Sequence, residues 1–304
     1  MSAGFKSGFV SLIGRPNAGK STLLNAMVGQ KVAIVADKPQ TTRTAIQGVV
    51  TLPEAQIVFV DTPGIHKADS HLNKRLMDTV RNALEERDLL LYVADAAGEF
   101  GAADRRAIDI ARRTETPLVL VLNKVDLLKD KALLLPLIEE YKAVCEFADY
   151  VPVSAIKKIG LDELRRVILK RLPEGPAYFP EDYVTDQPER FLAAELIREK
   201  VLLATRQEVP HAVAVMVDKW EETPKITRIY ATIRVERDGQ KAIVIGAGGA
   251  MLKHIGTLAR QEITKLLGVK IYLDLHVRVE PGWRENRAFL NTLDWRTMAG
   301  KDDF

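Results

Sequence analysis

The sequence has a single cysteine, Cys145, among 304 residues. One cysteine excludes a disulfide within the chain and any metal site built from several cysteines, which is typical of proteins in a reducing cytoplasm. No apolar run approaches the roughly 20 residues that a membrane-spanning helix needs. The formal net charge is only +3, so the overall charge does not point to nucleic acid, and only the distribution of charge could do so. We therefore expect a cytoplasmic protein.

Short apolar runs alternate with helical patterns through the first 170 or so residues. Runs of this kind predict a mostly parallel sheet with helices on both faces, an α/β fold. The segments around Ala33–Val35 and Ile46–Leu52 are candidates for an added edge strand. The main strands are predicted at Phe9–Ile13, Ile57–Val60, Leu89–Ala94, Leu118–Asn123 and Tyr150–Val153.

A proline-rich stretch then interrupts this alternation and predicts a linker. We place a first domain at 1–175, the linker at 176–188 and a second, α+β domain at 189–304. The order predicted for the second domain is α-β-β-α-β. Its helices are expected at Glu189–Thr205 and Met251–Leu267, and its strands at Ala212–Trp220, Thr227–Arg237 and Lys270–Val279, with Ala242–Ile245 read as a further apolar strand.

A complete phosphate-binding loop spans Gly14–Ser21, between an apolar strand and a helix-like stretch. Backbone N–H groups of such a loop surround the phosphates, helped by the positive end of the following helix. The Lys20 ammonium is the expected partner of the β- and γ-phosphates, and the Ser21 hydroxyl that of Mg²⁺. A glycine-rich turn without a ligand is the alternative. The loop's predicted nucleotide contacts are Gly14, Asn17, Ala18, Gly19, Lys20, Ser21 and Thr22.

Asp61-Thr62-Pro63-Gly64 follows the second apolar strand of the first domain. An aspartate at a strand end can hold Mg²⁺, usually through water, and the Gly64 N–H can contact the γ-phosphate. The alternative is a plain tight turn, since proline and glycine favour one.

Asn123-Lys124-Val125-Asp126 ends another strand, where ligands of open α/β sheets bind. The Asp126 carboxylate can accept hydrogen bonds from guanine N1–H and N2–H₂, which adenine does not offer as a pair. Ser154-Ala155-Ile156 would complete the base site, with the Ala155 N–H reaching guanine O6. The set of motifs therefore predicts a guanine nucleotide, GTP or GDP with Mg²⁺.

In their order, these motifs resemble the translation-factor-related class of GTPases. The resemblance places a Mg²⁺-binding threonine in the segment Lys38–Arg43 and favours Thr42, with Thr41 as the alternative. The metal site is then Ser21, Thr42 and Asp61. Residues that would assist hydrolysis are Lys20, Asn17, Thr42 and Gly64.

Ile65 occupies the position where many small GTPases have a water-orienting glutamine. An isoleucine cannot hydrogen-bond water. Similar GTPases that have an asparagine in this phosphate loop and lack the glutamine use it to help bind K⁺. We therefore hypothesise that Asn17 binds K⁺ and that hydrolysis is slow without it; the alternative is that Asn17 is only a turn residue beside Pro16.

Gly246-Ala247-Gly248-Gly249 precedes an amphipathic helix in the second domain. A Gly-x-x-Gly turn in this setting is the KH signature, in which bare backbone holds about four nucleotides of RNA. The alternative is a glycine turn without a ligand. Residues 239–270 hold five basic side chains and one acid, whereas 181–222 hold five basic side chains and ten acids. Positive charge therefore gathers around the loop, as phosphate binding requires, and Lys253 is a further RNA-binding candidate.

The whole chain resembles the Era family, bacterial GTPases with a C-terminal type II KH domain. In the second half this rests on Ile197–Lys200, on the glycine loop with Leu252–Gly256, and on Pro281–Arg284. It implies binding of 16S rRNA near its 3′ end, assistance to small-subunit assembly, a monomer, and loose association with the inner face of the cell membrane. The family's glycine loop usually contains a lysine, which Ala247-Gly248 lacks, so RNA binding would depend more on Lys253 and the C-terminal tail.

Two other functions remain open from the sequence. The second domain of a GTPase could bind protein rather than RNA. The chain could also be a non-enzymatic RNA-binding protein in which GTP only sets the conformation.

Trp283 is expected to pack in the core rather than to stack on RNA bases.

Overall fold

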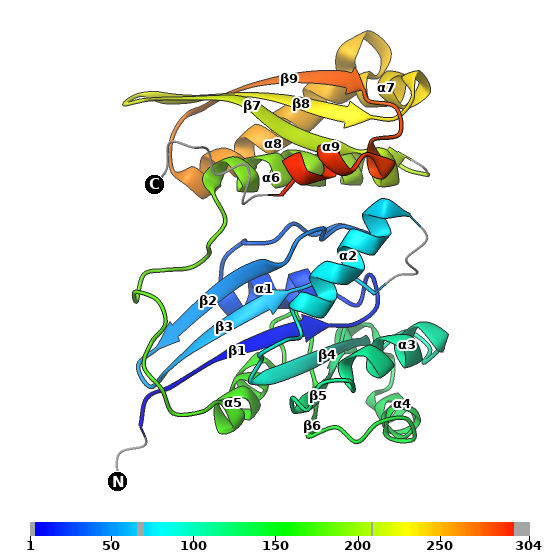
Figure 1. The fold of residues 1–304 in the computed structure, drawn as a ribbon, viewed down its shortest axis with the longest axis vertical. Helices are drawn as coiled ribbons and strands as arrows, with labels where there is room; N and C mark the ends of the chain where they lie inside the picture. Colours follow the sequence, from blue (N-terminus) through cyan, green and yellow to red (C-terminus); the bar gives the residue numbers. More distant parts are fainter. Residues whose placement is uncertain (1–3, 66–69, 208, 295–304) are drawn as a thin grey trace. The chain divides into compact units, whose positions relative to one another are not determined.

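The computed structural model describes residues 4–65, 70–207 and 209–294. These residues form two compact units, each with its own sheet (Figure 1). The first unit lies within Met1–Ala33, Thr42–Ala68 and Asn73–Asp186, and the second within Ile34–Thr41, Asp69–Leu72 and Gln187–Phe304.

The first unit contains a six-stranded sheet in the order β2-β3-β1-β4-β5-β6. Strand β2 is antiparallel to β3, and the remaining neighbours are parallel. The predicted mostly parallel sheet is therefore confirmed. Its strands are β1 (Lys6–Ile13), β2 (Ile46–Leu52), β3 (Ala55–Asp61), β4 (Leu89–Asp95), β5 (Leu118–Asn123) and β6 (Asp149–Pro152).

Of the two candidates for the edge strand, Ile46–Leu52 forms it and Ala33–Val35 lies outside all strands. The Asn25 side chain explains the difference. Its amide oxygen accepts the N–H groups of Val32 and Ala33 at 2.9 Å each, and its Nδ2 donates to the Ala33 carbonyl at 2.7 Å. These backbone groups are satisfied by a side chain and do not need a strand partner.

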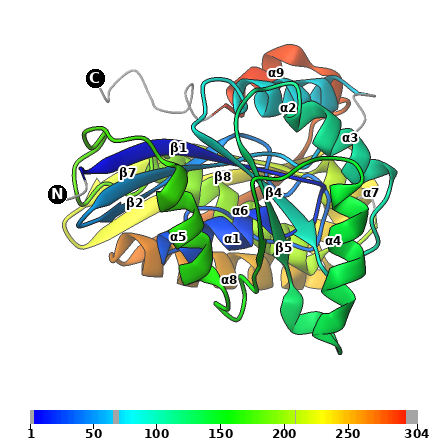
Figure 2. The same ribbon diagram turned by 90° about the horizontal axis from the view of Figure 1, so that it is seen from below.

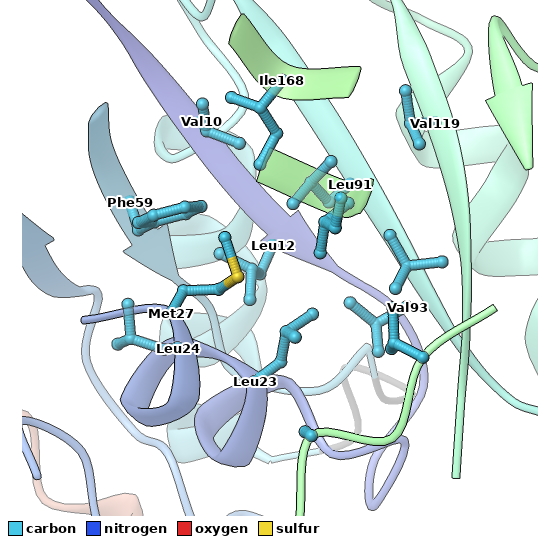
Figure 3. Close-up of a cluster of buried hydrophobic side chains, with 14 of the residues drawn as sticks. Val10, Leu12, Leu23, Leu24, Met27, Phe59, Leu91, Val93, Val119 and Ile168 are labelled. Carbon is cyan, nitrogen blue, oxygen red and sulfur yellow. The ribbon is translucent and has the colours of Figure 1, made fainter. Parts of the chain in front are cut away.

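Helices cover both faces of this sheet (Figure 2). Side chains of α1 (Lys20–Val28) and α5 (Leu161–Arg171) pack with the sheet in one apolar cluster, part of which is shown in Figure 3. A second cluster contains side chains of α2 (His71–Asn82), α3 (Ala102–Ala111) and α4 (Leu134–Lys142). Two short 3₁₀ helices, η1 (Val125–Leu127) and η2 (Lys131–Leu133), follow β5.

The second unit contains a three-stranded sheet, β7-β8-β9, with β7 and β8 antiparallel and β8 and β9 parallel. Helix α6 packs against β7, and α8 packs against β9 and α6. The longer elements are α6 (Glu189–Ala204), β7 (Ala214–Thr223), β8 (Ile226–Val235), α7 (Asp238–Ile245), α8 (Ala250–Leu267), β9 (Ile271–Val279) and α9 (Arg287–Thr292). The 3₁₀ helices are η3 (Val209–Ala212), η4 (Ala247–Gly249) and η5 (Trp283–Glu285).

The prediction of a strand at Ala242–Ile245 is wrong, because these residues form the second half of α7. The side-chain oxygen of Gln240 accepts the backbone N–H groups of Glu236 and Arg237 at 2.9 and 3.1 Å, which caps the first turn. Gln240 and Val244, four residues apart, are buried on one helix face. A short β-branched run fits a buried helix segment as well as a strand, and the order is α-β-β-α-α-β up to β9.

Within the described residues, no single helix has both the length and the apolar character to cross a bilayer. Helix α7 and the segment Ala247–Leu267 meet that test only when taken together, and they are bent by 42°.

Trp283 is fully buried in the second unit, as predicted. Its indole Nε1 donates to the Ala212 carbonyl at 2.9 Å, and its ring lies 5.7 Å from that of Phe289. This hydrogen bond satisfies the only polar atom of a large buried side chain.

We expect Trp283→Ala to lower the unfolding free energy of the second unit by about 3–5 kcal/mol, because it leaves a large cavity and an unpaired carbonyl. The half-buried Trp220 on β7 is the matched control, and its alanine variant should lose only about 1 kcal/mol. All three tryptophans of the sequence lie after residue 219, so urea unfolding followed by the fluorescence of the remaining two reports on this unit. An unchanged midpoint for Trp283→Ala would contradict the structural role.

Candidate nucleotide and RNA sites

The phosphate loop lies against the carboxyl ends of β4 and β5 and needs glycine at two positions. Gly14 has φ +152°, and a Cβ there would lie 2.3 Å from the Val93 carbonyl oxygen. Gly19 has φ +91°, and a Cβ there would lie 2.3 Å from the Asn123 side-chain nitrogen. Any larger residue would push the loop away from the sheet.

Lys20 begins α1 and is buried beneath the loop. Its ammonium donates to the carbonyl oxygens of Gly14 at 3.3 Å and Arg15 at 3.1 Å. Burial lowers the pKa of Lys20, and the negative charge of Asp61 opposes that change. The ammonium is thus held on the loop itself, in the position expected for contact with phosphate oxygens.

Ser21, Thr42 and Asp61 meet through their side-chain oxygens. Ser21 Oγ donates to Asp61 Oδ2 at 2.5 Å, Thr42 Oγ1 donates to the same oxygen at 3.2 Å, and the two hydroxyls are 2.8 Å apart. Burial raises the pKa of Asp61, while Lys20 and the two hydroxyls oppose the change.

The other carboxylate oxygen, Asp61 Oδ1, is buried and has no hydrogen-bond partner among the described residues. A buried oxygen without a donor is costly unless a cation lies near it. Two hydroxyls and a carboxylate are also the hard oxygen ligands that Mg²⁺ prefers. The cluster therefore fits the magnesium ion predicted for it.

The choice between the two threonines follows from their hydrogen bonds. The Thr41 hydroxyl donates to the carbonyl oxygens of Ala36 at 3.1 Å and Lys38 at 2.6 Å, within its own loop. Thr42 is buried and contacts Ser21 and Asp61. The structure thus brings the favoured residue, Thr42, together with Ser21 and Asp61, the two other residues predicted to hold Mg²⁺.

Gly64 and Ile65 occupy different environments. A Cβ on Gly64 would lie 2.8 Å from Pro16 Cα, so this backbone lies directly against the phosphate loop. Ile65 is 6% exposed and packs with Met77 and Val80 of α2 in the apolar cluster. Its side chain belongs to the core and cannot orient a water molecule.

Asn123 joins the phosphate loop to the base-binding loops. Its Nδ2 donates to the Ala18 carbonyl at 3.0 Å, and its Oδ1 accepts the Ala155 N–H at 3.1 Å. The side chain is 2% exposed. One buried amide therefore sets the spacing between the phosphate end and the base end of the site.

Asp126 lies at the exposed edge of the site. Ser154 Oγ donates to Asp126 Oδ1 at 2.5 Å and accepts the Lys157 N–H at 3.1 Å. This pair leaves Asp126 Oδ2 for a base. Of the other predicted contacts, Ile156 is 73% exposed beside the base loop, and Thr22 is half-buried on α1.

Sequence reasoning missed Asp95, which receives a 2.7 Å hydrogen bond from the Lys124 ammonium. Lys124 has φ +66°, an uncommon backbone conformation for a residue other than glycine. The signal was available, because Asp95 ends strand β4, at the sheet edge where β1, β3 and β5 also end.

The glycine loop of the second unit presents bare backbone. A Cβ on Gly246 would lie 2.6 Å from Met251 Cβ, so this position requires glycine. Gly248 (φ +57°) and Gly249 (φ +80°) have no atom within 4 Å of a Cβ placed on them. Ala247 in η4 and Lys253 on the first turn of α8 are both exposed. The backbone at Gly248 and Gly249 therefore leaves room for the close approach of a ligand.

Two family models match the sequence. A 50S ribosome-binding GTPase model matches residues 9–124, and a KH domain model matches 208–284. These matches assign the first unit to a GTPase domain and the second unit to a KH domain, which confirms the predicted fold class.

Curated relatives are similar over almost the whole chain. The GTPase Era of Geobacter metallireducens is 51% identical, covering 96% of this chain and 98% of the relative. The GTPase Era of Nostoc sp. is 49% identical, covering 96% of this chain and 90% of the relative.

Two solved structures share the fold, each at 41% identity over 96% of this chain and 99% of the other. They are Aquifex aeolicus Era, in a variant bound to GDP·AlF4⁻, with TM-score 0.92, and Era in complex with MgGDPNP and nucleotides 1506–1542 of 16S ribosomal RNA, with TM-score 0.93. The motifs, the two folds and this similarity agree, and the chain belongs to the Era family of GTPases.

Proposed function

We propose that this chain binds GTP with Mg²⁺, hydrolyses it slowly to GDP and phosphate, and binds 16S rRNA near its 3′ end through the KH domain during assembly of the small ribosomal subunit. The observation that carries the proposal is the buried Asn123 amide, which connects Ala18 of the phosphate loop with Ala155 of the base site. The similar Era structure with a GTP analogue and 16S rRNA nucleotides supports both ligands.

Hydrolysis transfers the γ-phosphoryl group to water: the bond from γ-phosphorus to the bridging oxygen breaks, and a bond to the water oxygen forms. The Lys20 ammonium and the Gly64 N–H would donate to oxygens on which charge develops. Mg²⁺, held by Ser21, Thr42 and Asp61, would neutralise charge on the β- and γ-phosphates. Since Ile65 is buried in the core, no side chain at that position orients the water, and we expect slow turnover.

We predict that Asp126→Asn exchanges guanine for xanthine specificity. The amide oxygen of Asn at position 126 can still accept the Ser154 hydrogen bond, but its amide N–H₂ then faces the N2–H₂ donor of guanine. Xanthine has an oxygen at that position of the ring, which can accept a hydrogen bond from the amide. GTP affinity should fall about 100-fold or more, since the amide N–H and a guanine N–H then face each other with no acceptor between them, while XTP should bind better than GTP.

Equilibrium binding of fluorescent, non-hydrolysable GTP and XTP analogues measures this exchange. Asp130→Asn is the matched control, because Asp130 is an exposed carboxylate that caps η2 in the same region. Unchanged GTP binding in Asp126→Asn would refute the assignment of the base site.

The proposal includes a potassium ion bound with the help of Asn17. Asn17 is exposed within the phosphate loop and has φ +61°, a conformation that asparagine tolerates better than most residues. This backbone conformation supports the interpretation of Asn17 as a turn residue. The exposed side-chain amide supports its interpretation as a ligand of K⁺. A K⁺ ion there would supply positive charge where other GTPases use an arginine finger.

We predict faster single-turnover hydrolysis in KCl than in NaCl, by about 10-fold, and loss of this difference in Asn17→Gly. Glycine keeps the left-handed conformation without strain and removes only the amide. GDP affinity, measured in parallel, should stay near that of the unchanged chain. Equal rates in the two salts would contradict the potassium proposal, and a K⁺ effect that persists in Asn17→Gly would contradict the role of Asn17.

The RNA part of the proposal rests on the glycine loop of the KH domain. Its open backbone at Gly248 and Gly249, with Lys253 beside it, supports RNA rather than protein as the ligand of this domain. The cytoplasmic location, the monomeric state and a loose association with the membrane stay predictions.

We predict that Gly248→Asp lowers affinity for an RNA with the sequence of the 3′ end of 16S rRNA by about 10-fold or more, because a negative charge would face the phosphates. Gly248→Asn is the matched control, since it has the same shape, tolerates the left-handed backbone and adds no charge. Filter binding at constant salt measures the difference. Equal binding by the two variants would indicate that the loop does not hold RNA.

A further inference from the structure

The side chain of Arg15, the second residue of the phosphate loop, is bound by the segment that connects β4 to α3. Its Nη1 donates to the Glu99 carbonyl at 3.0 Å and to Asp104 Oδ2 at 3.3 Å. A Cβ on Gly98 would lie 2.1 Å from Arg15 Nη2, so the guanidinium lies against bare backbone. The Arg15 carbonyl accepts from Lys20, so one residue connects the catalytic lysine with this segment.

Asp104, on the first turn of α3, is fully buried and accepts four hydrogen bonds. Oδ1 accepts the hydroxyls of Tyr92 and Tyr141 at 2.9 Å each, and Oδ2 accepts the Gly101 N–H at 3.1 Å and the Arg15 guanidinium. A buried carboxylate is retained only when its partners are complete. Its position is therefore set by β4, α3 and α4 together.

Both tyrosines are buried, at 0% and 1% exposure. Burial, followed by the negative charge of Asp104, raises the pKa of Tyr92 and of Tyr141. Their hydroxyls thus stay protonated and act as donors throughout the physiological range. With Arg15 and Asp104 they form a hydrogen-bond network outside the nucleotide contacts already described.

The two halves of the phosphate loop are held by different contacts. The half that follows Asn17 is held by the Asn123 bond to Ala18 and by the start of α1 at Lys20. The half that precedes it is held by the Arg15 side chain and by the close approach of Pro16 to Gly64. Gly64 is the residue whose N–H we assign to the γ-phosphate.

We propose that Asp104, Tyr92 and Tyr141 form a positioning site for Arg15, which aligns the loop from Arg15 to Asn17 for γ-phosphate cleavage. This proposal rests on the GTPase function proposed above. Because the second half of the loop has its own supports, loss of Arg15 should slow hydrolysis without an equal loss of nucleotide binding.

The test is single-turnover hydrolysis at saturating GTP, together with GDP affinity and the melting temperature. Arg15→Ala should hydrolyse about 10-fold more slowly, since small misplacements at a reacting centre have large kinetic effects, with a change in GDP affinity below about 3-fold. Arg105→Ala is the matched control: Arg105 is an exposed arginine on α3, stacked over Phe100 at 4.8 Å. It should leave the rate and the affinity unchanged.

A double-mutant cycle tests whether Arg15 acts through Asp104. If so, Arg15→Ala combined with Asp104→Asn should be no slower than the slower single variant, whereas independent residues would multiply their effects. Tyr141→Phe removes one donor with little change of shape and replaces Asp104→Asn in the cycle if that variant does not fold. Asp109→Asn is the control for Asp104→Asn, because Asp109 is an exposed carboxylate on the same helix. It should leave the hydrolysis rate unchanged.

Three results would overturn the positioning role. These are a normal hydrolysis rate in Arg15→Ala, effects that multiply in the double variant, and an equal fall of GDP affinity and rate with a lowered melting temperature. Failure of the unchanged chain to bind or hydrolyse GTP would instead refute the proposed function itself, so the two failures are distinguishable.

Discussion

The nucleotide site depends on one buried side-chain amide. Asn123 is 2% exposed and uses both ends of its side chain, donating to the Ala18 carbonyl and accepting the Ala155 N–H. It connects three segments that are far apart in the sequence. Because a buried amide with unmade hydrogen bonds is costly, the phosphate loop and the base loop keep their spacing only while both bonds exist. Gly19 is constrained by the same contact, since a Cβ there would displace the amide.

The parallel sheet places the rest of the chemistry. Strands β1, β3, β4 and β5 end at one edge, and their last or following residues are Gly14, Asp61, Asp95 and Asn123. At that edge Ser21, Thr42 and Asp61 meet, and Asp61 Oδ1 is buried with no hydrogen-bond partner among the described residues. A lysine whose pKa burial lowers and a carboxyl whose pKa burial raises lie in the same cluster. Bound phosphates would stabilise the charged form of the lysine, and a magnesium ion would stabilise the charged form of the carboxyl. The site therefore suits charged ligands.

The KH domain differs from the nucleotide site, because its glycine loop presents exposed backbone instead of a set of buried polar side chains. Gly246 is required by the packing of Met251, whereas Gly248 and Gly249 are open. The loop therefore separates a structural glycine from glycines that allow a close approach of the ligand. Positive charge near the loop comes from Lys253, which is exposed on the first turn of α8.

The sequence by itself determined the nucleotide, the two folds and most strands, because phosphate loops, base-reading motifs and apolar runs are local patterns. It did not settle Ala242–Ile245, where a cap made by Gln240 converts a strand-like run into a helix. Only the tertiary structure paired Asp95 with Lys124 and brought Asp104 to Arg15. The physical reason is distance along the chain: the partners of Lys124 and Arg15 lie 29 and 89 residues away, and no local pattern records which buried polar groups will satisfy one another.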